Sequence, residues 1–220
     1  HSAAQGLHIK IVGQQQAIEA QRRFNGAFNQ GHSPYLVHKL IQAYGVRFVD
    51  PAPAIAELMG SAFKPGDQCM LIPLTDVDGA VWSLQTIYPC AWKPNGSPVA
   101  TDKIVLKDSR KSGSMHWLAK SGESAPGWIL IAEGYATAAT VHEATSLPTV
   151  MCVDSGNMAK VVKAVRAKYQ DHRLMVCADD DHTTQSKTGR NPGLTAAHSA
   201  ATEVGGYWCS PQGLQAAESD

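Results

Sequence analysis

Two apolar segments of this chain end abruptly in carboxylates. Residues 129–132 are followed by Glu133, and residues 174–178 are followed by Asp179, Asp180 and Asp181. Apolar runs of this length are typical of buried strands, and parallel α/β sheets bind ligands beyond the carboxyl ends of their strands. Clustered carboxylates repel each other unless a hard cation such as Mg²⁺ or Mn²⁺ joins them. Glu133, Asp179 and Asp181 therefore predict a metal site that serves phosphate chemistry.

The spacing of Asp179 and Asp181 suits two ligands of one cation. Side chains two residues apart in an extended segment point to the same side, so both can reach one ion while Asp180 faces away. The alternative is structural. Glu133 can be an acid at the start of a helix, where the helix dipole favours it, and residues 179–181 can be turn residues.

The chain that must position these acids divides into three parts. We expect a helical segment over 1–31, a smaller mixed α+β unit over 32–125 and an α/β unit over 126–220. The boundary falls in the Ser/Gly/Pro-rich stretch 121–127. In the first two parts, helices are predicted over 14–28 and 35–43, and Gly45 is expected to end the helix over 35–43. A hairpin of strands 70–74 and 81–87 should follow, and then a loop over 89–98 and a strand over 103–106.

In the last part, strands and helices alternate. Strands are expected over 128–132, 149–153 and 174–178. Helices are expected over 135–144, over 157–169 with Asn157 as the cap, and over 194–204 after Asn191-Pro192. This alternation predicts a parallel sheet with right-handed crossovers, flanked by helices.

Composition narrows the choice of partners and compartment. The 220 residues include 19 basic and 19 acidic residues, so nucleic acid must bind a local patch rather than the bulk charge. No apolar run reaches membrane-spanning length, and no membrane partner is expected. The five cysteines form no C-x-x-C pair, which argues against a zinc ribbon and favours a reducing, cytoplasmic location.

Three segments resemble the TOPRIM domain of DnaG-like primases, above all their plasmid- and phage-type relatives. They are 131–138 (IAEGYATA), 152–157 (CVDSGN) and 178–181 (ADDD) with 191–193 (NPG). Upstream, 32–39 (HSPYLVHK) and 71–79 (LIPLTDVDG) are similar to the subdomain that precedes TOPRIM in those primases. The resemblance spans about residues 32–206. It implies a TOPRIM-type, Rossmann-like parallel sheet in which Glu133, Asp179 and Asp181 hold Mg²⁺ or Mn²⁺ for nucleotidyl transfer.

One position departs from that family's pattern. Replicative primases often carry another acid four residues after the motif glutamate, where this chain has Thr137. The metal would then be held by fewer ligands, or with help from Asp154 or Asp180. Glu133 could also serve as a general acid or base, because clustered carboxylates raise one pKa.

Basic residues in two loops are candidates for phosphate contact. By the same resemblance, the segment 103–113 faces the acids, with Lys103, Arg110 and Lys111 binding nucleotide or template phosphates. Lys187 and Arg190 lie in the polar loop 182–191, which could close over a triphosphate or a template strand. For both loops the alternative is a solvated surface segment.

Together, these features predict the catalytic core of a DNA primase, which makes short RNA primers on single-stranded DNA from ribonucleoside triphosphates. A replicative helicase is a candidate partner. Two other functions remain open. A TOPRIM nuclease would use the same acids to activate water, whereas a non-catalytic TOPRIM module would bind nucleic acid or a helicase.

Overall fold

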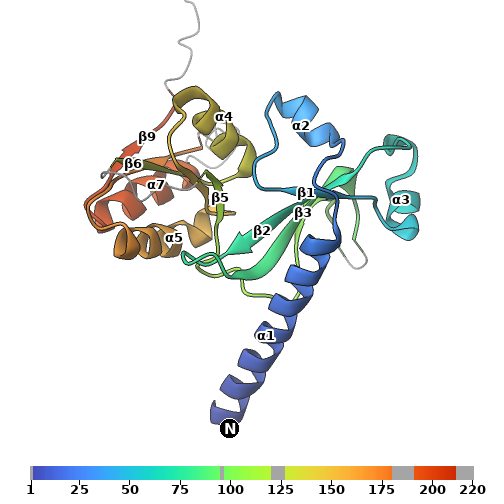
Figure 1. The fold of residues 1–220 in the computed structure, drawn as a ribbon, viewed down its shortest axis with the longest axis horizontal. Helices are drawn as coiled ribbons and strands as arrows, with labels where there is room; N and C mark the ends of the chain where they lie inside the picture. Colours follow the sequence, from blue (N-terminus) through green and yellow to red (C-terminus); the bar gives the residue numbers. More distant parts are fainter. Residues whose placement is uncertain (1, 95–96, 120–126, 180–190, 212–220) are drawn as a thin grey trace, which may run out of the picture.

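Two sheets make up the centre of the molecule, and helices surround them (Figure 1). The computed structural model describes residues 2–94, 97–119, 127–179 and 191–211. The first half of the described chain builds one sheet, and the second half builds the other (Figure 1). This mixed α/β architecture confirms the predicted fold class. Across the described residues, no helix has both the length and the apolar character needed to cross a bilayer.

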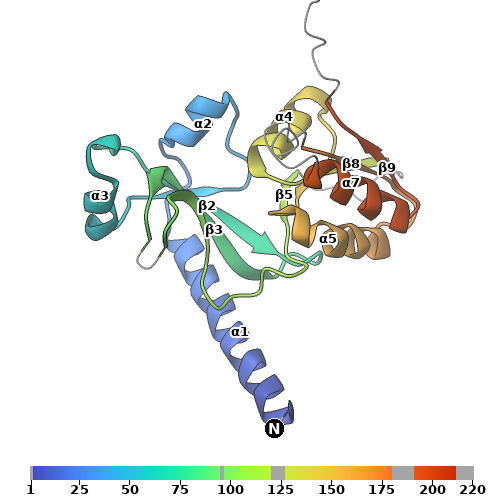
Figure 2. The ribbon, with the colours of Figure 1, turned by 180° about the vertical axis from the view of Figure 1, so that it is seen from behind.

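The N-terminal sheet is antiparallel. Its strands lie in the order β1 (Arg47–Val49), β2 (Cys69–Thr75), β3 (Val81–Trp92) and β4 (Thr101–Val105). Helices α1 (Ser2–Gly26), α2 (Pro34–Lys39) and α3 (Pro53–Met59) and the 3₁₀ turn η1 (Gly60–Ala62) surround it. Helix α1 projects from this sheet as a long arm (Figure 2). The pairing of β2 with β3 confirms the expected hairpin.

The C-terminal sheet carries the strands that precede the acids. Its order is β5 (His116–Ala119), β7 (Thr149–Met151), β6 (Trp128–Ala132), β8 (Arg173–Cys177) and β9 (Tyr207–Cys209). The strands are parallel except β5, which pairs antiparallel with β7. Helices α4 (Tyr135–Thr145), α5 (Ser155–Lys168) and α7 (Pro192–Glu203) connect or follow them.

Alternate side chains of the central strand β6 face different cores. Ile129 and Ile131 are buried with apolar residues of α5 and α7 on one face of the sheet. Leu130 and Ala132 are buried on the other face, together with α4 and residues of the N-terminal sheet. Because both faces of the parallel sheet are covered, its strands are continuously apolar, as their sequence indicated. The second of these cores joins the two sheets into one body.

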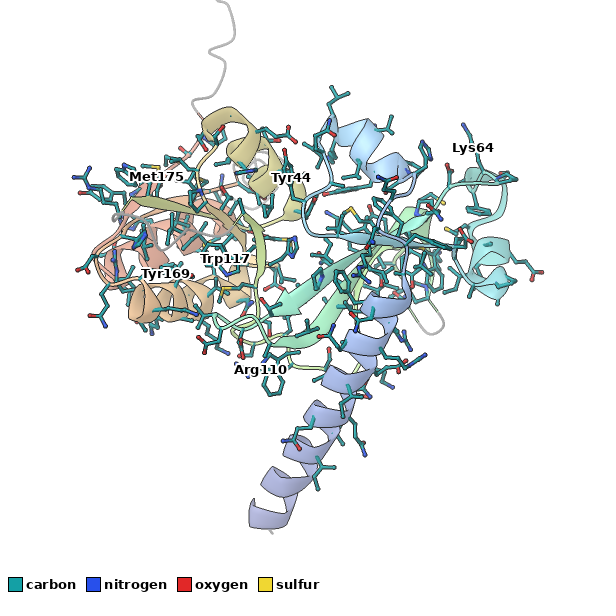
Figure 3. All side chains as sticks on the ribbon, in the orientation of Figure 1. Tyr44, Lys64, Arg110, Trp117, Tyr169 and Met175 are labelled. Atoms are coloured by element: carbon teal, nitrogen blue, oxygen red, sulfur yellow. The ribbon has the colours of Figure 1, made fainter. Side chains whose placement is uncertain are left out.

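Polar contacts also connect the two sheets. His116 on β5 is buried, and its ring nitrogens lie 2.8 Å from the Tyr44 carbonyl and 3.2 Å from the Pro73 carbonyl. Burial lowers the pKa of His116, so the ring is kept neutral. The Tyr135 hydroxyl accepts a 2.7 Å hydrogen bond from the Tyr44 amide. Figure 3 shows Tyr44 between the two halves of the molecule.

Several predicted helix boundaries were wrong. Helix α1 begins at Ser2 rather than near residue 14. Helix α2 ends at Lys39, well before Gly45, because Leu40 adopts a left-handed φ of 55° and its N–H reaches the Leu36 and Val37 carbonyls. Helix α3 was not predicted. Asp154, not Asn157, caps α5, because the Asp154 side chain accepts a hydrogen bond from the Asn157 amide.

Three short strands, β1, β5 and β9, were not predicted, whereas the three-residue strand β7 was. Strands β1 and β9 have three residues each, too few to show an alternating pattern. Strand β3 continues to Trp92, into the segment predicted to be a loop. Strand β5 lies in the segment 32–125 that we assigned to the α+β unit, yet it pairs with β7 of the C-terminal sheet. The predicted boundary itself, at 121–127, lies almost wholly outside the described residues.

Candidate active site at the carboxyl edge of the parallel sheet

Glu133 and Asp179 follow two adjacent parallel strands. Ala132 at the end of β6 is the register partner of Cys177 at the end of β8, so Glu133 and Asp179 leave the sheet at the same edge. Both residues are half-buried and line one cleft of about 470 Å³. Thr137, Ser155 and Gly193 line the same cleft. The structure thus brings together the two predicted acids that it describes.

Several negative charges at this edge of the sheet act on the buried thiol of Cys152. Burial raises the pKa of Cys152 most, and the charges of Glu133, Asp154 and Asp179 raise it further. Its sulfur lies 3.9 Å from the Glu133 carbonyl and 3.6 Å from the Asp154 carbonyl. The carboxylates that follow β6, β7 and β8 therefore all act on the pKa of this one buried thiol.

Helix α7 approaches the backbone of Asp179 closely. A Cβ atom at Gly193 would lie 2.5 Å from the Asp179 carbonyl oxygen, so only glycine fits this position without a shift of the backbone. Asn191 caps the helix, because its side chain accepts a hydrogen bond from the Leu194 amide. The Asn-Pro-Gly sequence therefore starts α7 directly against the strand end that carries Asp179.

Three helices begin at this edge. Helix α4 starts after Gly134, α5 after Asp154 and α7 after Asn191, and residues from all three line the cleft. The N-terminus of a helix presents free N–H groups and a partial positive charge, which favour anions. The cleft thus combines carboxylates, which attract cations, with helix ends, which attract phosphate.

Asn157 and Asp154 attach the basic loop to this edge. Asn157 is buried, and its side-chain amide donates to the Ser114 and Cys152 carbonyls and accepts from the Gly113 amide. One oxygen of Asp154 accepts from the Asn157 amide, and the other pairs with Lys111 at 2.6 Å. Lys111 is therefore brought to the acid edge, where it pairs with Asp154, the acid that the sequence named only as a helper to the three main ligands.

Val153 is held in an unusual backbone conformation between these partners. Its φ is 79°, a region that β-branched residues rarely adopt. The Cys152 carbonyl, one residue earlier, accepts from Asn157, and the Asp154 side chain, one residue later, caps α5. Such strain persists where the surrounding contacts fix the chain, and it is concentrated at functional sites.

Lys103 and Tyr35 come from the N-terminal half. The Lys103 ammonium lies 5.2 Å from the centre of the Tyr35 ring. The Tyr35 side chain is buried, which raises its pKa to about 12 against the effect of a hydrogen bond from the Ala136 backbone; the charges of Asp102 and Asp179 raise it further. Tyr35 thus lies at the start of α4, within reach of the charge on Asp179. We did not predict it as a site residue; its only signal was its place in the segment 32–39.

Arg110 has structural partners instead. Its guanidinium stacks over the Trp82 ring at 4.6 Å, and the Trp82 indole donates to Asp76. Figure 3 places Arg110 at the rim of the molecule, at the end away from α4. No described contact joins Arg110 to Glu133 or Asp179. Of the other two basic residues predicted in this segment, Lys111 pairs with Asp154 at the acid edge, and Lys103 lies over the Tyr35 ring.

Four residues of interest lie outside the described part of the chain. They are Asp180 and Asp181 of the acidic motif and Lys187 and Arg190 of the polar loop. Within the described residues, no group of three or more His, Cys, Asp or Glu side chains is arranged to hold a metal ion. Glu133 and Asp179 are two acids, and Asp181, the third predicted ligand, lies outside the described residues.

The donors that are described fit a hard cation. Glu133, Asp179, Thr137 and Ser155 offer only oxygen atoms to the cleft, and oxygen donors suit Mg²⁺ and Mn²⁺. The one sulfur nearby, on Cys152, is fully buried, and its raised pKa keeps it protonated. Soft metals that prefer thiolate would find no ligand among these groups.

The comparisons with known proteins point to one group. No protein-family model matches the chain. Over 136 residues, 61% of its length, the chain is 41% identical to a DNA primase TraC of Escherichia coli and 38% identical to a second. A solved DnaG primase catalytic domain bound to ssDNA matches with a TM-score of 0.51 and 13% identity, over 89% of this chain and 67% of that one. The chain is thus similar in sequence to a part of DNA primase TraC, and its fold is similar to that of the DnaG primase catalytic domain.

This homology confirms the family resemblance drawn from the sequence. The chain spans 12% and 9% of the length of the two TraC proteins, so it corresponds to a small part of each. Thr137, the departure from the replicative-primase pattern, lines the cleft as a neutral side chain. This chain thus has an oxygen donor at position 137 but no negative charge there.

Proposed function

We propose that this chain is the catalytic core of a DNA primase, which synthesises short RNA primers on single-stranded DNA. One observation carries the proposal: Glu133 and Asp179, predicted from strand ends, line one cleft where three helices begin. The homology to DNA primase TraC supports it, and so does the similarity in fold to a DnaG primase domain whose structure contains ssDNA.

The reaction joins a 3′-hydroxyl to the α-phosphate of a ribonucleoside triphosphate and releases pyrophosphate. Glu133 and Asp179, with Asp181, would hold Mg²⁺ or Mn²⁺, which when bound offsets charge on the transferring phosphoryl group. The amide groups at the starts of α4, α5 and α7 bind phosphate oxygens from the opposite side. The acids and the helix ends together fix the triphosphate in the cleft.

The N-terminal half supplies positive charge. Lys103 on β4 and Lys111 on the loop before β5 neutralise phosphate charge of the nucleotide or the template. The Lys103 ammonium is placed over the Tyr35 ring, 5.2 Å from its centre. Lys187 and Arg190 are proposed as further phosphate contacts, and Asp181 as the third acid.

A direct assay distinguishes this proposal from its alternatives. The protein is incubated with single-stranded DNA, labelled ribonucleoside triphosphates and Mg²⁺ or Mn²⁺. Template-dependent oligoribonucleotides are the expected product. Shortened DNA would instead identify a nuclease that uses the same acids. If neither product forms although the folded protein binds the DNA, the chain is a binding module and the proposal fails.

A further inference from the structure

Two cysteines face each other across the last two strands of the parallel sheet. Cys177 at the end of β8 and Cys209 at the end of β9 are direct register partners. Register partners on neighbouring strands project to the same face of a sheet. The Ala178 amide donates to the Cys209 carbonyl at 2.8 Å, which fixes the two strand ends beside each other.

The spacing of neighbouring strands suits a bond between these residues. Adjacent strands lie about 4.8 Å apart, and the Cα atoms of a disulfide are about 4.4–6.8 Å apart. Strand β9 has three residues and pairs only with β8 in the described sheet, so it can adjust to the shorter distance between Cβ atoms that a disulfide needs.

The two thiols differ in access. Cys177 is buried and Cys209 is exposed. Both line a second cleft of about 440 Å³, with an apolar wall that includes Trp128, Leu130 and Met175. This second cleft shares Thr137, Ala178 and Pro211 with the candidate active site, so the two clefts adjoin. A small oxidant reaches Cys209 from solvent, while Cys177 is held directly beside it.

We propose that Cys177 and Cys209 form a peroxide-sensitive dithiol that closes to a disulfide. The Cys209 thiolate attacks hydrogen peroxide, forming a sulfenic acid and releasing hydroxide, which takes a proton to become water. The Cys177 sulfur then attacks the Cys209 sulfur, the S–O bond breaks, and the leaving hydroxide takes the Cys177 proton. In sum, one peroxide and two thiols give one disulfide and two waters, and a dithiol reductant reverses the change.

The bond would enclose the acidic motif in a covalent ring. Residues 178–208 lie between the two cysteines, and they include Asp179, Asp181 and helix α7. The crosslink would draw the ends of β8 and β9 together, and Asp179 follows Cys177 by only two residues. We therefore infer that oxidation alters catalysis at the adjoining cleft, a consequence that rests on the proposed primase function. Formation of the disulfide itself does not depend on that function.

Thiol chemistry on the folded protein tests the proposal without an activity assay. The protein is treated with hydrogen peroxide, free thiols are counted by maleimide labelling under denaturing conditions, and the crosslink is located by peptide mass spectrometry. We expect the five free thiols to fall to three, with an intramolecular link between Cys177 and Cys209 that dithiothreitol removes.

Matched variants complete the test. Cys177→Ser should stop oxidation of Cys209 at the sulfenic or higher acids, Cys209→Ser should protect Cys177, and Cys90→Ser should leave the crosslink unchanged. Over-oxidation of Cys209 in the wild-type chain without a link to Cys177, or a link only between molecules, would overturn the proposal. If the link forms but primer synthesis is the same before and after oxidation, only the inferred effect on catalysis fails.

Discussion

The ends of β7 and β8 lie at one edge of the same sheet, and each is followed by an aspartate that is used differently. Asp154, after β7, has hydrogen-bond or ion-pair donors on both oxygens, because one caps α5 and the other binds Lys111. Asp179, after β8, lines the cleft with Glu133. An acid at a strand end is therefore not by itself a metal ligand, because its other contacts can give it a structural role instead. The suggestion that Asp154 helps to hold the metal stays a prediction, and its two oxygens already carry the α5 cap and the Lys111 ion pair.

The largest effect is expected from the cleft acids. Asp179→Asn keeps the shape of the side chain and removes its charge, so primer synthesis should fall by about a hundredfold or more while the melting temperature stays within a few degrees. Glu133→Gln should reduce primer synthesis by a similar factor. Asp154→Asn serves as the matched control at the neighbouring strand end and should keep activity within about tenfold. Equal losses in Asp154→Asn and Asp179→Asn would remove the distinction between the two strand ends.

The next effect concerns the buried amide that supports the β7 end. Asn157→Ala leaves the Gly113 amide and the Ser114 and Cys152 carbonyls without their partner, which should lower the free energy of unfolding by about 3 kcal/mol. Urea denaturation measures this change. Asn25→Ala, at an exposed position in the last turn of α1, is the control and should change the stability by less than about 0.5 kcal/mol. A loss below 1 kcal/mol for Asn157→Ala would show that the amide is not a structural link.

A smaller effect on stability distinguishes the helix-capping role of the Asp154 side chain from the role of its charge. Asp154→Ala removes the cap of α5 and should cost about 1 kcal/mol of stability, whereas Asp154→Asn, which keeps a capping oxygen, should cost a few tenths. The ion pair with Lys111 is partly exposed and adds little to either value. Thermal or chemical denaturation of the two variants checks the ranking; the same loss in both would assign the stability to the charge instead.

The smallest effect is expected from Lys111. Lys111→Ala should reduce the slope of log affinity for single-stranded DNA against log salt by about 0.7, the value for one phosphate contact, and weaken binding modestly. Lys64→Ala is the control, because Lys64 lies near α3 on the opposite side of the molecule (Figure 3). Fluorescence anisotropy at several salt concentrations measures both slopes. An unchanged slope for Lys111→Ala would leave that lysine with a structural role only, as the partner of Asp154.

The positions of Glu133 and Asp179 could be predicted from the sequence because each follows a continuous apolar run, 128–132 in β6 and 174–178 at the end of β8, and the rule for strand ends is local. The role of Asp154 could not be predicted, since its lysine partner is 43 residues away and is brought near only by the tertiary fold. Strand β5 was missed for the same reason. Its buried histidine reads as polar, and its partners Tyr44 and Pro73 belong to the other half of the molecule.

Binding of Mn²⁺, followed by electron paramagnetic resonance, tests the central claim most directly. The wild-type protein should bind the ion, Glu133→Gln and Asp179→Asn should each weaken binding by about tenfold or more, and Asp154→Asn should leave it within about twofold. Unchanged affinity in both cleft variants, with correct folding confirmed by circular dichroism, would contradict the assignment of these strand ends as the metal site.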